Sequence, residues 1–161
     1  MYRRLTEYGV RIDSPYAPGD GGSALNAVAQ RARSRQSGGC VPDFIVRQAN
    51  ADDFEVVSDL YRRSSLSNER DREVLLANPE VLVFEDVSIR EGRTRVAVDN
   101  GRVVGFATTR VVGDIAELDD LFVDPDWMRQ GVARTLVDDA VAVAKTRGIT
   151  WIEVTANPRH R

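Results

Sequence analysis

A short run of residues, 128–134, combines residue types that suit an anion site. Gly131 and Ala133 stand between an expected strand and an expected helix, and Arg129 and Arg134 lie beside them. Small residues at a helix start let backbone N–H groups approach a phosphate at the positive end of the helix dipole. Gly-x-Ala also opens many ordinary helices, but the strand and proline before it strengthen the interpretation. We call residues 128–134 the phosphate turn.

The helix after this turn is the clearest element in the sequence. Val132, Leu136, Ala140 and Ala144 fall on one face at helical spacing, and Gly148 stands where the helix should end. Hydrophobic periodicity and turn-forming residues predict the other elements. These are strands over residues 44–48, 94–98, 103–112, 115–123 and 149–155, and helices over residues 51–65 and 69–77.

The predicted elements follow the order β-α-α-β-β-β-α-β. The strand–helix–strand unit at the end implies a right-handed crossover, so its two strands should run parallel. Asn100-Gly101 is a strong hairpin signal between two earlier strands. We therefore predict an α/β (α+β) fold with a mixed, mostly antiparallel twisted sheet, formed by residues 41–161. Residues 1–40 are rich in turn formers and are expected to be a disordered extension, apart from a short helix over 24–33.

Composition excludes several classes of protein. Hydrophobic residues make up 42% of the 161 residues and charged residues 29%, which is typical of a soluble globular protein. No apolar run approaches the roughly 20 residues of a membrane span, and no signal peptide is recognisable. We therefore expect a cytoplasmic protein with no membrane partner. A single cysteine, Cys40, and a single histidine, His160, argue against a disulfide and against a metal site.

Charge is spread unevenly along the chain. Residues 1–40 contain six arginines and three acids, a net charge of +3, whereas the whole chain carries −3. Residues 41–161 therefore carry −6, which argues against nucleic acid as a partner. The acidic balance mildly suits a cationic substrate such as an amine, although ordinary surface charge for solubility is the simpler explanation.

The phosphate turn resembles the acetyl-CoA motif of GNAT-superfamily acetyltransferases, Gln/Arg-x-x-Gly-x-Gly/Ala. Gly131 and Ala133 match the motif, and Met128 departs from it at the first position. The resemblance extends over about 120 residues from Val41 and includes the run 101–107. It implies an N-acetyltransferase that uses acetyl-CoA as co-substrate and needs no metal. It leaves the acceptor amine open, because the substrate loops of this family differ widely on a shared scaffold.

The resemblance also assigns roles to individual residues. Leu121, Phe122 and Val123 would line the pantetheine arm, with the following strand splayed away to admit it. The pyrophosphate would lie on Arg129, Gln130, Gly131, Val132, Ala133 and Arg134. Asn157 matches an asparagine beside the cofactor, although Asn-Pro is also ordinary turn chemistry. Residues of the first two helices would border the substrate pocket, or simply form an exposed helix face; they are Tyr61, Arg62, Ser65, Asn68, Glu69 and Arg72.

A glutamate base is common in this family where Glu117 stands. Strand alternation predicts that Glu117, Asp119, Leu121 and Val123 share one face. A carboxylate there would take a proton from an attacking amine, directly or through water. Asp119 and Asp120 are weaker candidates for the same role or for holding a cationic substrate. The alternative for Glu117 is a solvated acid on an exposed strand.

The family continues beyond the asparagine with a helix carrying a Phe-Tyr-x-x-x-Gly-Phe-like motif and two more strands. Its tyrosine often protonates the leaving thiolate, and this sequence ends at Arg161 without that segment. The resemblance therefore predicts a domain that lacks its final helix and strands and leaves a strand edge open. Three explanations of the missing segment stay open: the sequence is part of a longer enzyme, a second copy or partner chain covers that edge, or the domain is degenerate. The alternative function is a non-catalytic CoA-binding or interaction module.

Overall fold

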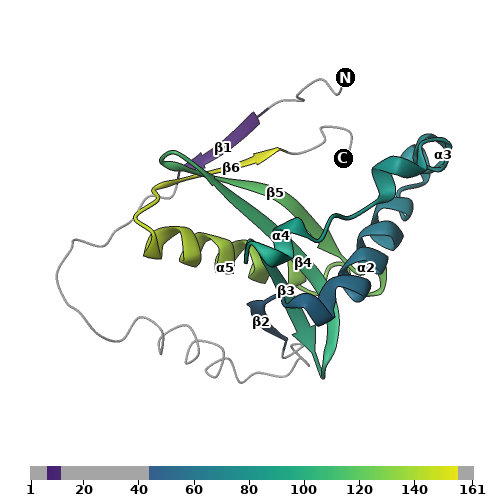
Figure 1. Cartoon of the computed structure of the whole chain (residues 1–161), viewed down its shortest axis with the longest axis horizontal. Coiled ribbons are helices and arrows are strands. Elements are labelled where there is room, and N and C mark those ends of the chain that lie inside the picture. The colour runs from purple at the N-terminus through teal and green to yellow at the C-terminus, as the bar shows by residue number, and fades with distance from the viewer. Residues whose placement is uncertain (1–6, 12–43, 156–161) are drawn as a thin grey trace.

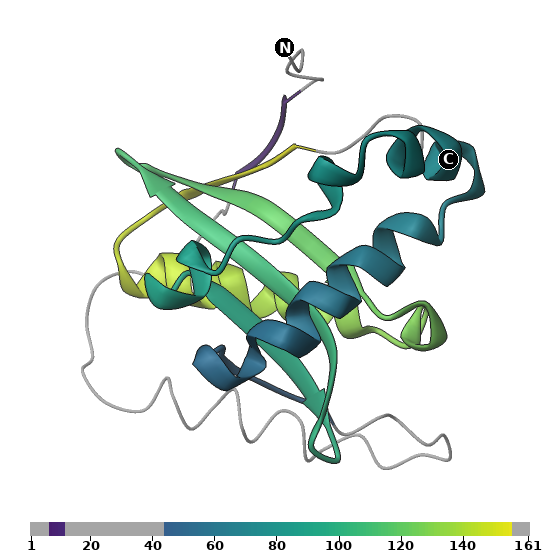
Figure 2. The same cartoon turned by 45° about the vertical axis from the view of Figure 1, so that its right-hand side comes forward.

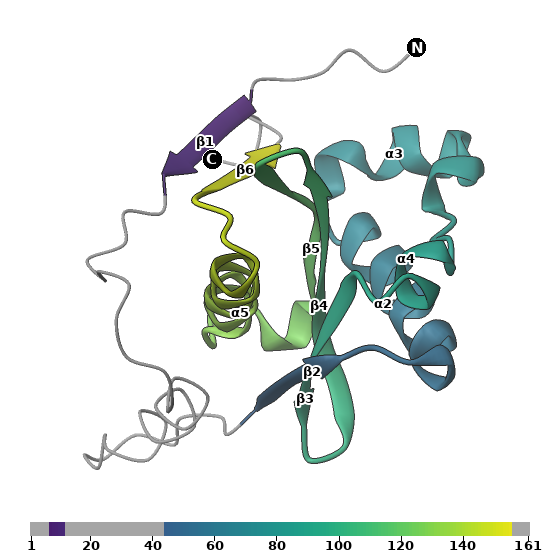
Figure 3. The same ribbon diagram turned by 60° about the vertical axis from the view of Figure 1, so that its left-hand side comes forward.

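The structure of the chain, a computed structural model, describes residues 7–11 and 44–155. The strands are β1 (Glu7–Arg11), β2 (Ile45–Gln48), β3 (Thr94–Asp99), β4 (Arg102–Val112), β5 (Ile115–Val123) and β6 (Trp151–Thr155). The helices are α2 (Phe54–Leu66), α3 (Glu69–Ala77), α4 (Val87–Arg90) and α5 (Val132–Thr146), with short 3₁₀ turns η1 (Ala51–Asp53), η2 (Pro79–Leu82) and η3 (Pro125–Trp127). The helices cover both faces of one sheet: α2, α3 and α4 lie on one face and α5 on the other (Figure 1, Figure 3).

The sheet has the strand order β1-β6-β5-β4-β3-β2. Its neighbouring strands are antiparallel except β5 and β6, which run parallel on either side of the crossover helix α5. This topology confirms the predicted mixed, mostly antiparallel sheet and its parallel end. The β3–β4 hairpin turns at Asn100 and Gly101, whose φ angles of 46° and 83° are those that an Asn-Gly hairpin requires.

Two layers of apolar side chains hold the helices on the sheet. On one face, Val57 and Leu60 of α2 pack on Phe106, and on the other Leu136 of α5 packs on Val104. Helix α5 comes unusually close to β4 at Gly105. A Cβ there would lie 2.8 Å from Val132 Cγ1, 3.0 Å from the Phe122 carbonyl oxygen and 3.2 Å from Leu136 Cδ1. The missing side chain of Gly105 thus allows the start of α5, and with it the phosphate turn, to lie against the sheet.

Strand β1 corrects the expectation for the N-terminal residues. Residues 1–40 were expected to be disordered, but Glu7–Arg11 forms an edge strand antiparallel to β6, from Glu7 opposite Thr155 to Arg11 opposite Trp151. The unpaired backbone groups of an edge strand favour such an addition, and Tyr8 and Val10 alternate with polar residues or glycine as a strand allows. Within the described residues, β1 thus pairs the edge of β6 that the sequence analysis expected to be open. The predicted helix over 24–33 lies outside the described residues.

Candidate functional site

The sheet opens at the carboxyl end of β5. Within residues 44–155, pairing between β5 and β6 runs from Ile115 opposite Trp151 to Leu118 opposite Val154. Strand β5 continues to Val123, still paired with β4 on its other side. Among the described residues, its backbone groups between 119 and 123 have no partner on the β6 side, where the sequence analysis predicts a splay. An extended amide chain entering this opening would pair with β5 as an added strand does.

A β-bulge lies where the two strands separate. Thr108 of β4 faces Asp120, but the next residue, Thr109, faces Leu118, so Asp119 has no partner of its own in β4. A bulge inserts one residue into a strand and shifts the side-chain alternation beyond it. Signals in a single strand do not reveal such an insertion, because it depends on the register with the neighbour.

The bulge corrects the predicted face of the strand. Glu117, Asp119, Leu121 and Val123 were expected to point the same way, but Leu121 and Val123 pack with Leu118 in the layer under α5. The carboxylates Glu117 and Asp119 instead share Arg110, which is hydrogen-bonded to Glu117 and lies 3.5 Å from Asp119. Glu117 is thus separated from the aliphatic side chains with which it was grouped.

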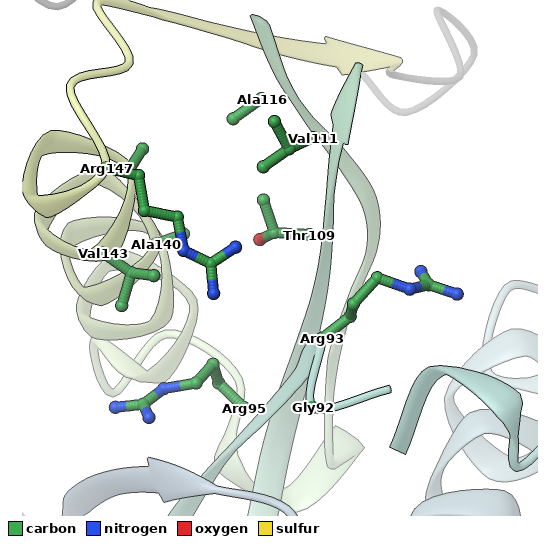
Figure 4. Close-up of a pocket in the computed structure, with 10 residues that line it drawn as sticks. Gly92, Arg93, Arg95, Thr109, Val111, Ala116, Ala140, Val143 and Arg147 are labelled. Carbon is green, nitrogen blue, oxygen red and sulfur yellow. The ribbon is translucent and has the colours of Figure 1, made fainter. Parts of the chain in front are cut away.

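Asp119 and Asp120 differ in what surrounds them. Burial raises the pKa of Asp119, opposed by the charges of Arg110 and Arg93, whose guanidinium lies 3.8 Å away. Arg93 points away from α5, toward the opposite face of the sheet (Figure 4). Burial also raises the pKa of Asp120, and a hydrogen bond with Thr108 opposes the shift. Asp120 is therefore the carboxylate of β5 whose environment most resembles that of a base.

A buried chain of hydroxyl groups leads away from Asp120. The Thr108 and Thr94 oxygens lie 3.2 Å apart, and Thr94 donates to Ser88 of α4 at 3.0 Å. All three hydroxyl residues are buried. The chain fixes the Thr108 side chain and hence the group that faces the Asp120 carboxylate.

Glu153 is a further candidate proton acceptor, and the sequence analysis missed it. It lies directly opposite Glu117 in the parallel β5–β6 pair, and its carboxylate accepts a hydrogen bond from Trp151 Nε1 at 3.2 Å. Alternation with the buried Ile152 was the available signal for its orientation. Two strands therefore bring carboxylates to the point where the sheet opens.

The phosphate turn begins after η3 and ends in the first turn of α5. Arg129 has φ 63° and Gly131 has φ 90°, both in the left-handed region that non-glycine residues rarely adopt. Gly131 is the N-cap of α5, and no side chain caps the helix. The first backbone N–H groups of an α-helix have no partner within it, so they are available to an anion here.

The predicted cofactor residues divide into two groups in the turn. Arg129, Gln130 and Arg134 are exposed, and Arg134 forms a long ion pair with Asp138 at 4.0 Å. Val132 is buried under the sheet, so only its backbone can face a ligand. The turn thus presents backbone N–H groups surrounded by exposed basic and polar side chains. Asn157 lies outside the described residues.

An open cleft of about 510 Å³ extends from the turn to α2 and α3, within the size range of ligand sites. Except for Leu75 of α3, its lining is polar on the helix side, and it is apolar on the strand side: Ser64, Ser65, Ser67, Asn68, Asp71, Leu75, Leu121, Phe122 and Met128. Of the predicted pocket residues, Ser65 and Asn68 line it. Tyr61 packs edge-on against Phe122 and donates to the Val81 carbonyl at 2.9 Å, behind the cleft. Arg62, Glu69 and Arg72 are not among the lining residues.

A second hollow lies between α5 and the sheet, near the other end of the helix (Figure 4). Thr109, Val111 and Arg147 line it together with Arg95, whose guanidinium pairs with Asp139 at 2.7 Å. Its volume of about 30 Å³ suffices for about one water molecule. The larger cleft is therefore the candidate site.

Comparison with known proteins agrees with this geometry. A model of the acetyltransferase (GNAT) family matches residues 54–161. The chain is 42% identical over 60 residues to the [ribosomal protein bS18]-alanine N-acetyltransferase of Escherichia coli (strain K12), an alignment covering 36% of this chain and 40% of that protein. The Salmonella typhimurium protein of the same name is 41% identical over 58 residues, covering 35% and 39%. These alignments thus span less than half the length of the curated relatives.

Solved structures share the fold at low sequence identity. The PaiA N-acetyltransferase of Thermoplasma acidophilum, in complex with coenzyme A, matches with a TM-score of 0.53 and 18% identity over 66% of this chain and 75% of that one. A GNAT family acetyltransferase of Brucella melitensis, in complex with acetyl-CoA, matches with a TM-score of 0.52 and 13% identity over 74% and 79%. Within the described part of the chain, no helix has the length and apolar character of a membrane span.

Proposed function

The chain belongs to the acetyltransferase (GNAT) family, and we propose that it transfers an acetyl group from acetyl-CoA to a primary amine of a small molecule or a protein. One observation supports the proposal most strongly. The uncapped N-terminus of α5 follows the carboxyl end of β5, whose backbone along 119–123 has no partner on the β6 side in the part of the chain that the structure describes. A phosphate group and an extended amide chain are the two parts of coenzyme A that these features suit.

The cofactor is proposed to follow the strand from the turn toward the bulge. Its pyrophosphate lies on the N–H groups after Gly131, with Arg129 and Arg134 supplying charge. Its pantetheine arm pairs with the backbone of Leu121 and Val123, which brings the thioester to the level of Asp120. The coenzyme A and acetyl-CoA complexes of the two structural relatives support this choice of ligand.

The reaction is proposed to be direct attack of a neutral amine on the thioester carbonyl. A backbone N–H at the bulge stabilises the oxyanion, a carboxylate accepts the amine proton, and the coenzyme A thiolate leaves. The sequence assigns the base to Glu117, and this assignment is a proposal. Asp120 is the structural alternative, because it is half-buried and next to the cleft residue Leu121.

The acceptor is proposed to be an amine that enters the cleft from the α2–α3 side. Asp71 supplies a negative charge among serines and Asn68, so a protonated amine would be attracted before it loses its proton. The curated relatives act, by name, on an alanine of a ribosomal protein. A protein N-terminus is therefore a reasonable first acceptor to test, beside small amines.

A second candidate function is acetyl-CoA binding without turnover. The ion pair of Glu117 with Arg110 favours it, because the guanidinium already occupies a carboxylate oxygen that would have to face the attacking amine. One experiment separates the two functions. The full chain is incubated with acetyl-CoA and a panel of small amines and peptides with free N-termini, and free thiol and acetylated product are measured.

Turnover of an amine supports the enzyme. Thermal stabilisation by acetyl-CoA without turnover favours the binding module, because a ligand that binds only the folded state raises the midpoint of unfolding. Neither stabilisation nor turnover would contradict both functions.

A further inference from the structure

A fully buried carboxylate lies between β5 and the 3₁₀ turn η3 that leads to the phosphate turn. Asp124 has no exposed surface, follows the last residue of β5 and is the N-cap of η3. Its Oδ2 accepts hydrogen bonds from Arg102 at 2.9 Å and from Arg63 at 3.2 Å, and its Oδ1 accepts one from the backbone N–H of Asp126 at 3.1 Å. Its own N–H donates to the Val104 carbonyl at 2.9 Å.

The partners of Asp124 come from both sides of the cleft. Arg63 precedes the cleft residue Ser64 near the end of α2, whereas Asp126 belongs to η3, which leads to the cleft residue Met128. Helix α2 crosses the face of the sheet toward the end where β5 enters this turn (Figure 2). One side chain thus connects the helical wall of the cleft to the start of the phosphate turn.

Stability alone is a weak reason for this arrangement. Removing a carboxylate from water is costly, and the hydrogen bonds of a buried ion pair often do little more than offset that cost. For Asp124, burial would raise the pKa, but the hydrogen bonds from Asp126, Arg63 and Arg102 together lower it, so the group is ionised. What the ion pairs supply is a fixed geometry between three segments of the chain.

Another buried aspartate provides an internal comparison. Asp53 also stands at a 3₁₀ turn, accepts two bonds from Arg47 at 2.7 and 2.8 Å, and accepts the Asn50 N–H at 2.9 Å. It lies at the opposite end of α2 from Arg63, and neither it nor its partners line the cleft. The two aspartates have similar chemistry but different positions relative to the site.

We propose that Asp124 is a positioning residue: through Arg63 it holds the end of α2 at a fixed distance from the phosphate turn and so keeps the turn in the conformation that binds the cofactor. This inference rests on the proposed use of acetyl-CoA. It predicts that breaking the connection weakens cofactor binding by more than the loss of stability explains.

The test compares Asp124→Asn with Asp53→Asn and with two arginine variants, Arg63→Met and Arg102→Met. Acetyl-CoA affinity is measured by calorimetry, and the midpoint of thermal unfolding is measured on the same samples. We expect Asp124→Asn to weaken acetyl-CoA binding by about tenfold, and Arg63→Met by a smaller factor that Arg63→Lys partly restores. Asp53→Asn should lower the midpoint of unfolding and leave the affinity unchanged.

Arg63→Met keeps the test decisive if Asp124→Asn does not fold, because the Arg63 side chain is 41% exposed and the rest of the cluster stays in place. Equal affinities for the wild type and Arg63→Met would overturn the inference while leaving acetyl-CoA binding established. Losses of affinity that follow the losses of midpoint across all variants, Asp53→Asn included, would also overturn it. If the wild type does not bind acetyl-CoA, the proposed function fails and the inference fails with it.

Discussion

The phosphate turn and helix α3 border the same cleft from two sides, and the core holds them very differently. Helix α5, which starts at the turn, buries Val132, Leu136, Ala140 and Ala144, whereas α3 buries none of its side chains. The start of α5 lies against Gly105, and the turn follows the buried Asp124. Helix α3 keeps its first turn through the Asn68 cap. The wall proposed to bind the cofactor (the cofactor side) is thus fixed by the core, and the wall proposed to receive the acceptor (the acceptor side) is free to change without loss of the fold.

The largest expected effect concerns the base, on the cofactor side. The variants Glu117→Gln and Asp120→Asn each remove one candidate base. The variant that removes the residue acting as the base should lower kcat by about two orders of magnitude or more, and the other variant should change kcat less. Because burial raises the pKa of Asp120, a reaction that depends on it should lose rate on acidification at a higher pH than an ordinary aspartate implies. The pH profile of kcat in wild type and both variants provides the measurement. Two variants with wild-type rates would leave Glu153 as the next carboxylate to examine.

The next effect tests how tightly α5 is fitted to the sheet. Gly105→Ala places a Cβ within 2.8 Å of Val132 Cγ1 and should destabilise the fold by about 1–3 kcal/mol, the usual effect of overpacking. Urea unfolding gives the value. In a double-mutant cycle with Val132→Ala, which removes the clashing atom, the double variant should be less destabilised than the sum of the single variants. Strict additivity would contradict the close fit.

Some elements of the fold follow from local sequence signals, and others depend on contacts between distant parts of the chain. The bounds 115–123 and 69–77 agree with β5 and α3, because alternation, an N-cap and an Asn-Pro stop are local signals. The bulge at Asp119 was not predictable, because the register depends on a neighbouring strand. Strand β1 pairs with a strand at the far end of the sequence, which no local pattern specifies. Helix α4, a single turn at Val87–Arg90, is too short to have a periodicity.

The residues of the candidate site divide in the same way, into those that local sequence signals indicate and those whose surroundings depend on the tertiary fold. Gly131 and Arg129 were singled out by their types and spacing at a strand–helix junction, and the structure places both there with positive φ; their role in cofactor binding stays a prediction. The roles of Asp124 and Asp120 depend on contacts with Arg63 and Thr108, which are distant in sequence. Local sequence signals therefore locate the turn, whereas the surroundings of these two carboxylates depend on the tertiary fold.

A smaller effect is expected in how the free energy of unfolding depends on pH. It concerns Asp53, at the end of α2 that is remote from the cleft. The hydrogen bond from Arg47 lowers the pKa of Asp53 against the effect of burial. A depressed folded-state pKa adds stability above the ordinary aspartate pKa, and that stability is lost as pH falls toward the folded-state value. Asp53→Asn should cost about 1–2 kcal/mol at neutral pH and less in acid. Urea unfolding across this range measures it, and an equal cost at every pH would contradict the pairing.

The smallest effect is expected on the acceptor side. Val74 of α3 is 63% exposed, so Val74→Ala should change the free energy of unfolding by less than about 0.5 kcal/mol. The same substitution at Val132 of α5, which is 1% exposed, should cost about 2 kcal/mol. Thermal unfolding of both variants tests the contrast. Equal costs would show that α3 contributes to the core as much as α5 does.

Binding of acetyl-CoA at the phosphate turn is tested most directly by a pair of glycine variants. Gly131 and Gly113 both have positive φ, and a Cβ on either would meet no described atom within 4 Å. Gly131 caps α5 in the turn, whereas Gly113 lies in the β4–β5 hairpin. Calorimetric titration of acetyl-CoA should give equal affinities for the wild type and Gly113→Ala, and at least about tenfold weaker binding for Gly131→Ala. Equal affinity of Gly131→Ala and Gly113→Ala, or no binding to the wild type, would contradict the account.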